Sequence, residues 1–286
     1  MTKSASRKAW DGYNMQRELV RTLETLTPRY QRGAGSLRWE VIVLDNGSDC
    51  PVEKSLGQLF PHVKVVYPEQ VHGSPAKAIN AAMALARAPL LGLLIDGARM
   101  ASPGMIRLAH KAWRTDPNKA VGTLAFHLGP EVQQRSVPEG YDAEQEDRLL
   151  GSVPWREDGY RLFDISVLAL SSAAGWSGPI AESNAVFLDR RVWHALGGLD
   201  ERFQFPGGGY VNLDFWERAV AYSQHKPWIL LGEGTFHQVH GGVSTNGPEG
   251  VRNQMADDYH RIHGRPYFLP QYIPRFIGEP RRRVGL

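Results

Sequence analysis

Residues 88–100 read APLLGLLIDGARM, an apolar run that ends in a single carboxylate, Asp96, followed by Gly97. The run at 90–95 is almost unbroken, which predicts a strand of a parallel sheet that is buried on both faces. Ligands of open α/β sheets bind beyond the carboxyl ends of the strands, so Asp96 is expected to face that crevice. Gly97 is expected to let the backbone turn away at once. The alternative is a turn-capping aspartate, the commoner role for a lone Asp at such a position.

Strand and helix patterns alternate on both sides of this segment. Apolar runs predict strands at 39–44, 63–67, 120–126, 185–188 and 228–231. Helical spacing and capping residues predict helices at 19–26, 74–86, 102–113 and 190–196, and one that begins at Asn212 or Asp214. This alternation predicts an α/β fold with a mostly parallel, twisted sheet and helices on both faces. Two of the strands end in acids, Asp45 and Asp96, which indicates that the strand ends form a site.

Composition limits the class of protein. Of 286 residues, 22% are charged and 42% hydrophobic, and the net charge of +3 comes without a basic stripe interleaved with aromatics, so nucleic-acid binding is not expected. A single cysteine, Cys50, leaves no intramolecular disulfide or multi-cysteine zinc site and is typical of a reducing compartment. No run approaches the roughly 18 apolar residues that span a bilayer, and the first residues lack a signal-peptide pattern, so we expect a cytoplasmic protein. Arg281, Arg282 and Arg283 leave peripheral contact with an anionic membrane surface as an alternative to a solvated terminus.

We expect one domain over 1–286, with a first half at 1–126, a second half at 127–264, and a C-terminal tail at 265–286. The stretch 127–180 has no regular pattern, which favours a long excursion over the crevice. The glycine tract at 206–210 is interpreted either as a loop that closes over the site or as a place of tight backbone packing.

Six segments in order resemble family-two glycosyltransferases of the GT-A fold. They are GYNMQRELVRTLETL, WEVIVLDNGSD, GSPAKAINAAMALARA, LLIDGA, NAVFLDRRVWHALGGLDERF and HGGVST, and their order and spacing carry the resemblance. The resemblance implies an inverting transfer of a hexosyl or deoxyhexosyl group from a nucleotide-diphosphate donor to an acceptor hydroxyl, assisted by Mn²⁺ or Mg²⁺. It also implies that 1–126 is the nucleotide-sugar-binding half and 127–264 the acceptor and lid half. It leaves the acceptor open among a glycan, a lipid-linked sugar and a small molecule.

The chain departs from the family pattern in three places. The position of the usual first strand reads SASRKAWDG, with Lys8 and Asp11 poorly suited to a buried strand. The Asp-x-Asp metal motif is reduced to Asp96 followed by Gly97 and Ala98. Asn212 stands where the catalytic base is usual, and an amide takes no proton at neutral pH.

For the cation, we expect Asp96 and His240 as ligands, with His237 as the alternative to His240. In an extended loop positions 237 and 240 point to opposite sides, so both are not expected to bind one metal. The positions matching the family's nucleotide site are Tyr13, Asn14, Asp45, Asn46, Lys77, Asp96 and Gly97. The alternatives are an Asx turn at Asp45 and Asn46 and a solvated Lys77.

For the catalytic base, Asp214 is the first candidate and Glu182 the second. A helix-capping Asp214 is the alternative, and Glu182 has the alternatives of holding a sugar hydroxyl or pairing with an arginine. Asp200 and Glu201 are expected to brace a turn. Two other functions remain: a catalytically impaired relative that binds nucleotide or glycan, and a nucleotidyltransferase. The second needs a glycine-rich basic loop near the N-terminus, and none is present in the sequence.

Overall fold

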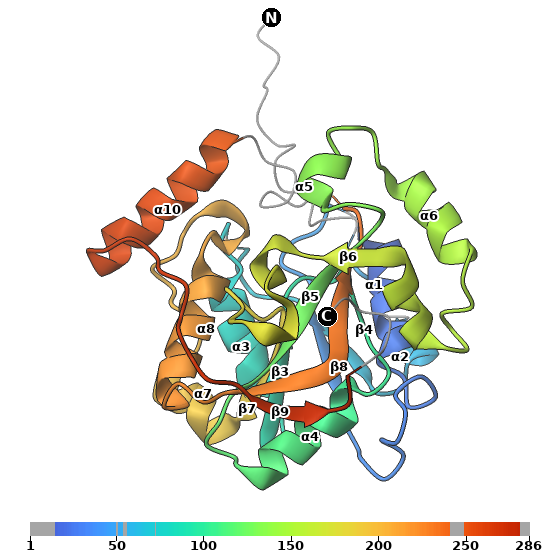
Figure 1. Cartoon of the computed structure of the whole chain (residues 1–286), viewed down its shortest axis with the longest axis horizontal. Coiled ribbons are helices and arrows are strands. Elements are labelled where there is room, and N and C mark those ends of the chain that lie inside the picture. Colours follow the sequence, from blue (N-terminus) through green and yellow to red (C-terminus); the bar gives the residue numbers. More distant parts are fainter. Residues whose placement is uncertain (1–14, 50, 54–55, 72, 241–248, 281–286) are drawn as a thin grey trace, which may run out of the picture.

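The computed structural model describes residues 15–49, 51–53, 56–71, 73–240 and 249–280. Figure 1 shows helices packed around a central sheet. The helices are α1 (Gln16–Thr25), α2 (Leu56–Leu59), α3 (Ala76–Leu85), α4 (Met105–Thr115), α5 (Gln133–Ser136), α6 (Ala143–Gly151), α7 (Arg190–Leu196), α8 (Val211–Tyr222) and α10 (Glu249–His263). The strands are β1 (Val41–Leu44), β2 (Val63–Val66), β3 (Leu90–Leu94), β4 (Arg99–Ala101), β5 (Val121–Leu128), β6 (Ser166–Leu168), β7 (Ala185–Asp189), β8 (Trp228–His237) and β9 (Arg275–Gly278).

The central sheet has seven strands, in the order β3-β7-β5-β8-β4, with β6 beside β5 and β9 beside β8. The pairings make β3, β5, β8 and β9 run in one direction and β4, β6 and β7 in the other. Strands β1 and β2 form a separate parallel pair. The α/β class is therefore confirmed, but the sheet is mixed.

The predicted parallel pairing of the strand at 90–95 is wrong in detail. Strand β3 pairs antiparallel with β7, with Leu94 beside Ala185. Leu91 and Leu93 are buried on one face, whereas Leu90 and Leu94 on the other face are only partly buried and Gly92 between them is exposed, so burial on both faces is incomplete. An apolar run reports burial but not the direction of the neighbouring strand.

The sheet separates two hydrophobic clusters, because successive side chains of a strand face opposite sides. On one side, Val121, Phe187 and Leu230 pack with α4. On the other side, Val186 and Ile229 pack with α7 and α8. Helices thus cover both faces, as the sequence predicted.

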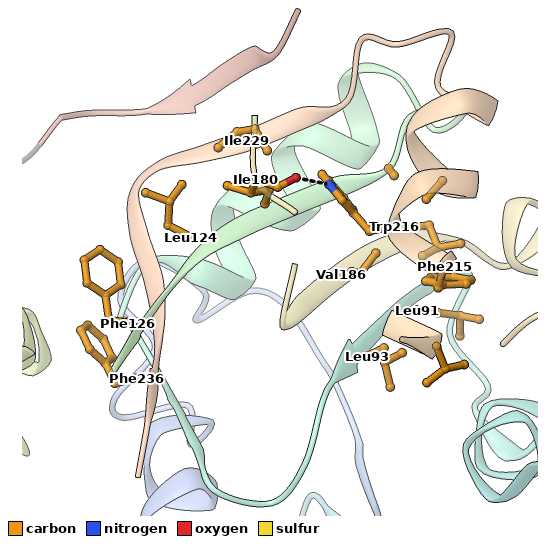
Figure 2. Packing of buried hydrophobic residues seen from close by; sticks show 14 of the residues in the cluster. Leu91, Leu93, Leu124, Phe126, Ile180, Val186, Phe215, Trp216, Ile229 and Phe236 are labelled. Carbon is orange, nitrogen blue, oxygen red and sulfur yellow. Dashed lines mark hydrogen bonds between the residues drawn. The ribbon is translucent and has the colours of Figure 1, made fainter. Parts of the chain in front are cut away.

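Trp216 of α8 lies at the centre of the second cluster and is fully buried. Its indole Nε1 donates to the carbonyl oxygen of Ile180 at 3.2 Å, the dashed line in Figure 2. Gly122 of β5 makes room for this ring, since a Cβ there would come within 2.6 Å of it. A glycine in the middle of a strand marks such a close approach.

Strand β8 continues six residues beyond the predicted end at 231. Gly232 has a positive φ of 78°, and the register with β5 shifts between Gly122 and Leu124. This β-bulge interrupts the apolar pattern, which is why the sequence indicated a shorter strand. The extension carries the chain to His237.

The segment 127–180 is folded, so the expected irregular excursion is wrong in that respect. It contains α5, α6 and the short strand β6. Trp155, Phe163 and Trp176 are buried in the same cluster as Trp216. Part of the predicted tail is also integral to the sheet, as strand β9.

The glycine tract is a tight turn beside the start of α3. Gly207, Gly208 and Gly209 all have positive φ, and a Cβ on Gly208 would come within 2.7 Å of Val211. This favours the tight-packing interpretation of the tract. Among the described helices, none is both long and apolar enough to cross a bilayer.

Asn80 of α3 joins that helix to the turn that follows α7. Its amide Nδ2 donates to the carbonyl oxygen of Leu199 and its Oδ1 accepts from the Leu199 N–H, both at 2.9 Å. Leu199 is buried, so removing the amide leaves two backbone groups without a partner. Asn80→Ala is expected to lower the free energy of unfolding by about 1–3 kcal/mol, measured by urea denaturation. Lys77→Ala, at an exposed position of the same helix, serves as the control and should change it by less than about 0.5 kcal/mol. Equal effects of the two substitutions would contradict this role of Asn80.

Candidate active site

Five strand ends meet at one edge of the sheet. Asp96 follows the carboxyl end of β3, and His237 is the last residue of β8. The antiparallel register of β4 and β8 places Arg99 opposite His237, and the parallel register of β5 and β8 places His127 beside it. Glu182 comes shortly before the start of β7 at the same edge. Hydrogen-bonded registers thus gather these side chains from distant parts of the sequence.

The turn after β3 falls on Asp96 and not on Gly97. Asp96 has a φ of 61°, and its Oδ1 accepts a hydrogen bond from the Ala98 N–H at 2.9 Å. Aspartate tolerates this left-handed conformation because its side chain bonds the backbone locally. The other oxygen, Oδ2, lies 3.2 Å from Nε of Arg99. The carboxylate therefore caps the turn and also faces the site.

His237, the last residue of β8, and His240 point to the same side, which corrects the expectation that they diverge. Nε2 of His237 lies 2.8 Å from Nε2 of His240 and 3.7 Å from Oδ2 of Asp96. The chain between the histidines is bent, because β8 ends at His237 and Gln238 donates its N–H to the carbonyl oxygen of Ala98. The opposite-sides argument holds only for an extended chain.

Burial keeps both imidazoles neutral. Burial, together with the Arg99 guanidinium, lowers the pKa of His237 well below its usual value. Burial also lowers the pKa of His240, against the opposing effect of Asp96. A neutral imidazole has a free lone pair, which is the form that binds a metal ion.

The donor set fits a divalent cation. Asp96, His237 and His240 offer one carboxylate oxygen and two imidazole nitrogens, all within 4.8 Å of one another. Ligands about 2.1 Å from an octahedral ion lie about 3 Å apart, close to the spacing of the two imidazole nitrogens. The Asp96 carboxylate has lone pairs left after its bonds to Ala98 and Arg99, because a carboxylate accepts about four. The site therefore joins His237 to the two ligands expected from the sequence.

Glu182 is half-buried beside this cluster. Its carboxylate is hydrogen-bonded by the side chains of Asn184 and Ser171. Burial is the largest cause of its raised pKa; the negative charge of Asp96 adds to it and the Arg99 guanidinium opposes it. A carboxylate whose pKa is raised is a stronger proton acceptor, which suits a group that takes a proton from a hydroxyl.

Asp214 lies in a different cluster. Its carboxylate is almost fully buried, with Oδ2 2.7 Å from Nη2 of Arg218 and Oδ1 3.1 Å from Nε2 of His263. It does not cap its helix, since the residue at the N-cap of α8 is Tyr210. Asp200 is close to the same group. Asp214 as the base stays a prediction, which these ion pairs do not support.

Some of the residues expected to bind the nucleotide are hydrogen-bonded within the protein itself. Both oxygens of buried Asp45 accept hydrogen bonds within its own loop, Oδ1 from Ser48 and Oδ2 from the Val52 N–H. Asn46 is partly buried at the carboxyl end of β1, and Lys77 is exposed in the first turn of α3. Gly97 packs against α1 and accepts a hydrogen bond from Thr22. Tyr13 and Asn14, like residues 241–245 of the HGGVST segment, lie outside the described residues.

Sequence reasoning overlooked Arg99 and gave His237 only second place. A charged residue within the short apolar segment RMA was the available signal for Arg99. The spacing of His237 and His240 was the available signal for a pair. It indicates a pair only if the chain bends after β8, and the sequence did not show that bend.

Known proteins resemble this chain in sequence and in fold. Residues 13–169 match the family described as glycosyl transferase family 2. Two curated relatives are validoxylamine A glucosyltransferases of Streptomyces hygroscopicus. The one from subsp. limoneus is 28% identical over 217 residues, which are 71% of this chain and 45% of the relative. The one from subsp. jinggangensis (strain 5008) is 29% identical over 218 residues, which are 71% and 49%. The chain thus spans about half the length of the curated relatives it matches.

Among solved structures, GalNAc-T7 with UDP, GalNAc and Mn²⁺ is similar with a TM-score of 0.53 and 13% identity. The match covers 86% of this chain and 46% of GalNAc-T7. At this identity the likeness shows the fold alone, and it confirms the predicted GT-A class.

Both histidines are expected to contribute to cation binding. His237→Ala and His240→Ala should each weaken Mn²⁺ binding by at least about tenfold, because loss even of groups behind metal ligands costs that much. Titration of the free Mn²⁺ signal by electron paramagnetic resonance measures the affinity. His260→Ala, at an exposed position of α10, is the control and should bind as the unsubstituted protein does. Full affinity in His237→Ala would show that His240 alone is the histidine ligand.

Proposed function

Since the chain belongs to glycosyl transferase family 2, we propose that it transfers a sugar from a nucleoside diphosphate donor to an acceptor hydroxyl, with inversion and with a divalent cation. The observation that carries the proposal is the cluster of Asp96, His237 and His240 beside Glu182, at the edge of the sheet where β3, β5 and β8 have their carboxyl ends. Ligands of open α/β sheets bind at this edge.

The cation would be held by Asp96, His237 and His240. When bound, it supplies positive charge that stabilises the diphosphate leaving group. Two imidazole nitrogens beside one carboxylate favour Mn²⁺ over Mg²⁺, because Mg²⁺ prefers oxygen ligands alone. The presence of Mn²⁺ in the similar GalNAc-T7 structure supports this choice.

Glu182 is proposed as the general base. Its carboxylate lies close enough to Asp96 and Arg99 for their charges to influence it. A base at this place takes the proton of the acceptor hydroxyl as that oxygen attacks the sugar carbon and the bond to the diphosphate breaks. Asn184 and Ser171 hold the carboxylate in position, and Arg99 holds Asp96.

Asp214 is proposed to stabilise the fold instead. Its carboxylate compensates the guanidinium of Arg218, and its Oδ1 lies 3.1 Å from Nε2 of His263 at the end of α10. A base in this position would have to leave its ion pair with Arg218 before it could accept a proton. Breaking a buried ion pair by removing one partner is costly.

The donor is proposed to be a nucleoside diphosphate glucose. The two Streptomyces relatives are named glucosyltransferases, which favours a hexosyl over a deoxyhexosyl group. For the nucleotide, we propose contacts with Asn46 after β1 and Lys77 at the start of α3, and with Tyr13 and Asn14.

A cytoplasmic location is also proposed, because a single cysteine is typical of proteins in a reducing compartment.

A donor panel tests the proposal and its rival, a relative that binds without turnover. UDP-, GDP- and dTDP-glucose with Mn²⁺ are compared by thermal shift, with the galactose and rhamnose donors as controls for the sugar. At least one glucose donor should raise the melting temperature, and EDTA should cancel the rise, because a ligand that binds only the folded state stabilises it. Asp96→Ala should abolish donor hydrolysis. Stabilisation without hydrolysis or transfer would favour the binding protein, and no stabilisation would contradict both functions.

The base is tested by two isosteric substitutions. Glu182→Gln should lower kcat by about 10²–10⁴-fold while the melting temperature stays close to that of the unsubstituted protein. Asp214→Asn should lower the melting temperature, because it removes the charge that compensates Arg218, and leave kcat within a few-fold. Loss of kcat in Asp214→Asn at unchanged stability would assign the base to Asp214.

A further inference from the structure

His237 is held by a side chain of α5, which belongs to the segment 127–180 for which no regular structure was predicted. The amide Nε2 of buried Gln133 donates to the carbonyl oxygens of His237 at 3.1 Å and Leu128 at 3.4 Å. These two bonds fix which end of the amide is the oxygen. That oxygen, Oε1, lies 2.6 Å from Nδ1 of His237 and must accept a proton from it. The neutral ring therefore carries its proton on Nδ1 and its lone pair on Nε2, the atom that faces His240 and Asp96.

Helix α6 holds the chain between the two histidines. Glu146 is fully buried, and its Oε2 accepts the Val239 N–H at 2.7 Å. The helix itself is held against α1 by the ion pairs of Asp147 with Arg17 and Arg21. This contact fixes the bend that turns His240 back toward His237.

Burying a carboxyl group costs free energy unless its oxygens find hydrogen-bond partners. Burial raises the pKa of Glu146 to about 8, against the effects of Val239 and Arg21. The nearest guanidinium nitrogen, Nη1 of Arg21, is 3.8 Å from Oε1, beyond hydrogen-bond distance. A leucine of similar volume would pack at less cost, so the side chain is explained by the backbone group that it holds.

We propose that Gln133 and Glu146 are positioning residues for the cation site; this inference rests on the proposed function. Gln133 selects the tautomer of His237 that offers Nε2 to the cation, and Glu146 holds the bend that brings Nε2 of His240 within reach. Neither residue contacts the cation. Groups of this kind change metal affinity through the ligands that they orient.

The test is a Mn²⁺ titration of the purified full chain, followed by electron paramagnetic resonance. Gln133→Met and Glu146→Leu are expected to weaken Mn²⁺ binding by about 10–100-fold. Glu146→Gln keeps an oxygen acceptor for the Val239 N–H and should bind within a few-fold of the unsubstituted protein. Gln145→Met and Glu144→Gln, at exposed positions of α6, are the matched controls and should bind normally.

A spectroscopic signature separates positioning from general stability. Pulsed measurements of nitrogen hyperfine coupling to bound Mn²⁺ should detect two imidazoles in the unsubstituted protein and in Glu146→Gln, but only one in Glu146→Leu. Circular dichroism and the melting temperature report whether each variant is folded.

The outcomes separate this inference from the proposed function. Absence of Mn²⁺ binding in the unsubstituted protein removes the cation site and the inference with it. Normal affinity and two imidazoles in folded Gln133→Met and Glu146→Leu overturn the inference and leave the cation site in place. If one of these variants does not fold, the other decides. If neither folds while Glu146→Gln does, the two side chains are structural and the inference is overturned.

Discussion

Strand β8 determines where the site lies, because its backbone groups are hydrogen-bonded to three other strands. It pairs with β5 and β9 along its first part and with β5 and β4 toward its end. Buried backbone N–H and C=O groups must find partners, so a shift of register would leave several of them unpaired. The register that satisfies them places His237 opposite Arg99 and beside His127. The site is thus a consequence of sheet pairing as much as of its own side chains.

The electrostatics of the site follow from this burial. An imidazole enclosed by strands loses water, and Arg99 nearby adds a second reason for His237 to stay neutral. The same guanidinium keeps the Asp96 carboxylate in place. Two neutral nitrogens and one carboxylate are the combination that a divalent transition metal ion binds. Desolvation therefore keeps the proposed ligand nitrogens neutral, and the Arg99 guanidinium offsets the negative charge of Asp96.

The segment 127–180 links the core to the site. Trp155 and Trp176 anchor it in the hydrophobic cluster under α8, while Gln133 and Glu146 reach from it to the histidine turn. A segment held this firmly can orient ligands, which a loose lid cannot. This part of the chain is sensitive to substitution, because replacing either of these buried polar side chains would leave a buried group without its hydrogen-bond partner.

The sequence by itself determined the α/β class and the order of six of the nine described strands, and its resemblance to the family added the candidates His240 and Glu182 to Asp96. It did so because apolar periodicity, capping residues and turn residues act over a few neighbours, and the order of motifs follows from the chain. Helix α7 began and ended at the predicted residues because Asp189 caps its start and Gly197 its end. Only the tertiary structure decided the direction of β3, the extent of β8 and the meeting of His237 with His240. It also tied Asp214 to Arg218 and His263, away from the contacts that Glu182 makes. The direction of β3, the extent of β8, the turn between the two histidines and the contact of Asp214 with His263 depend on residues far apart in the sequence. No local pattern records which distant groups will meet.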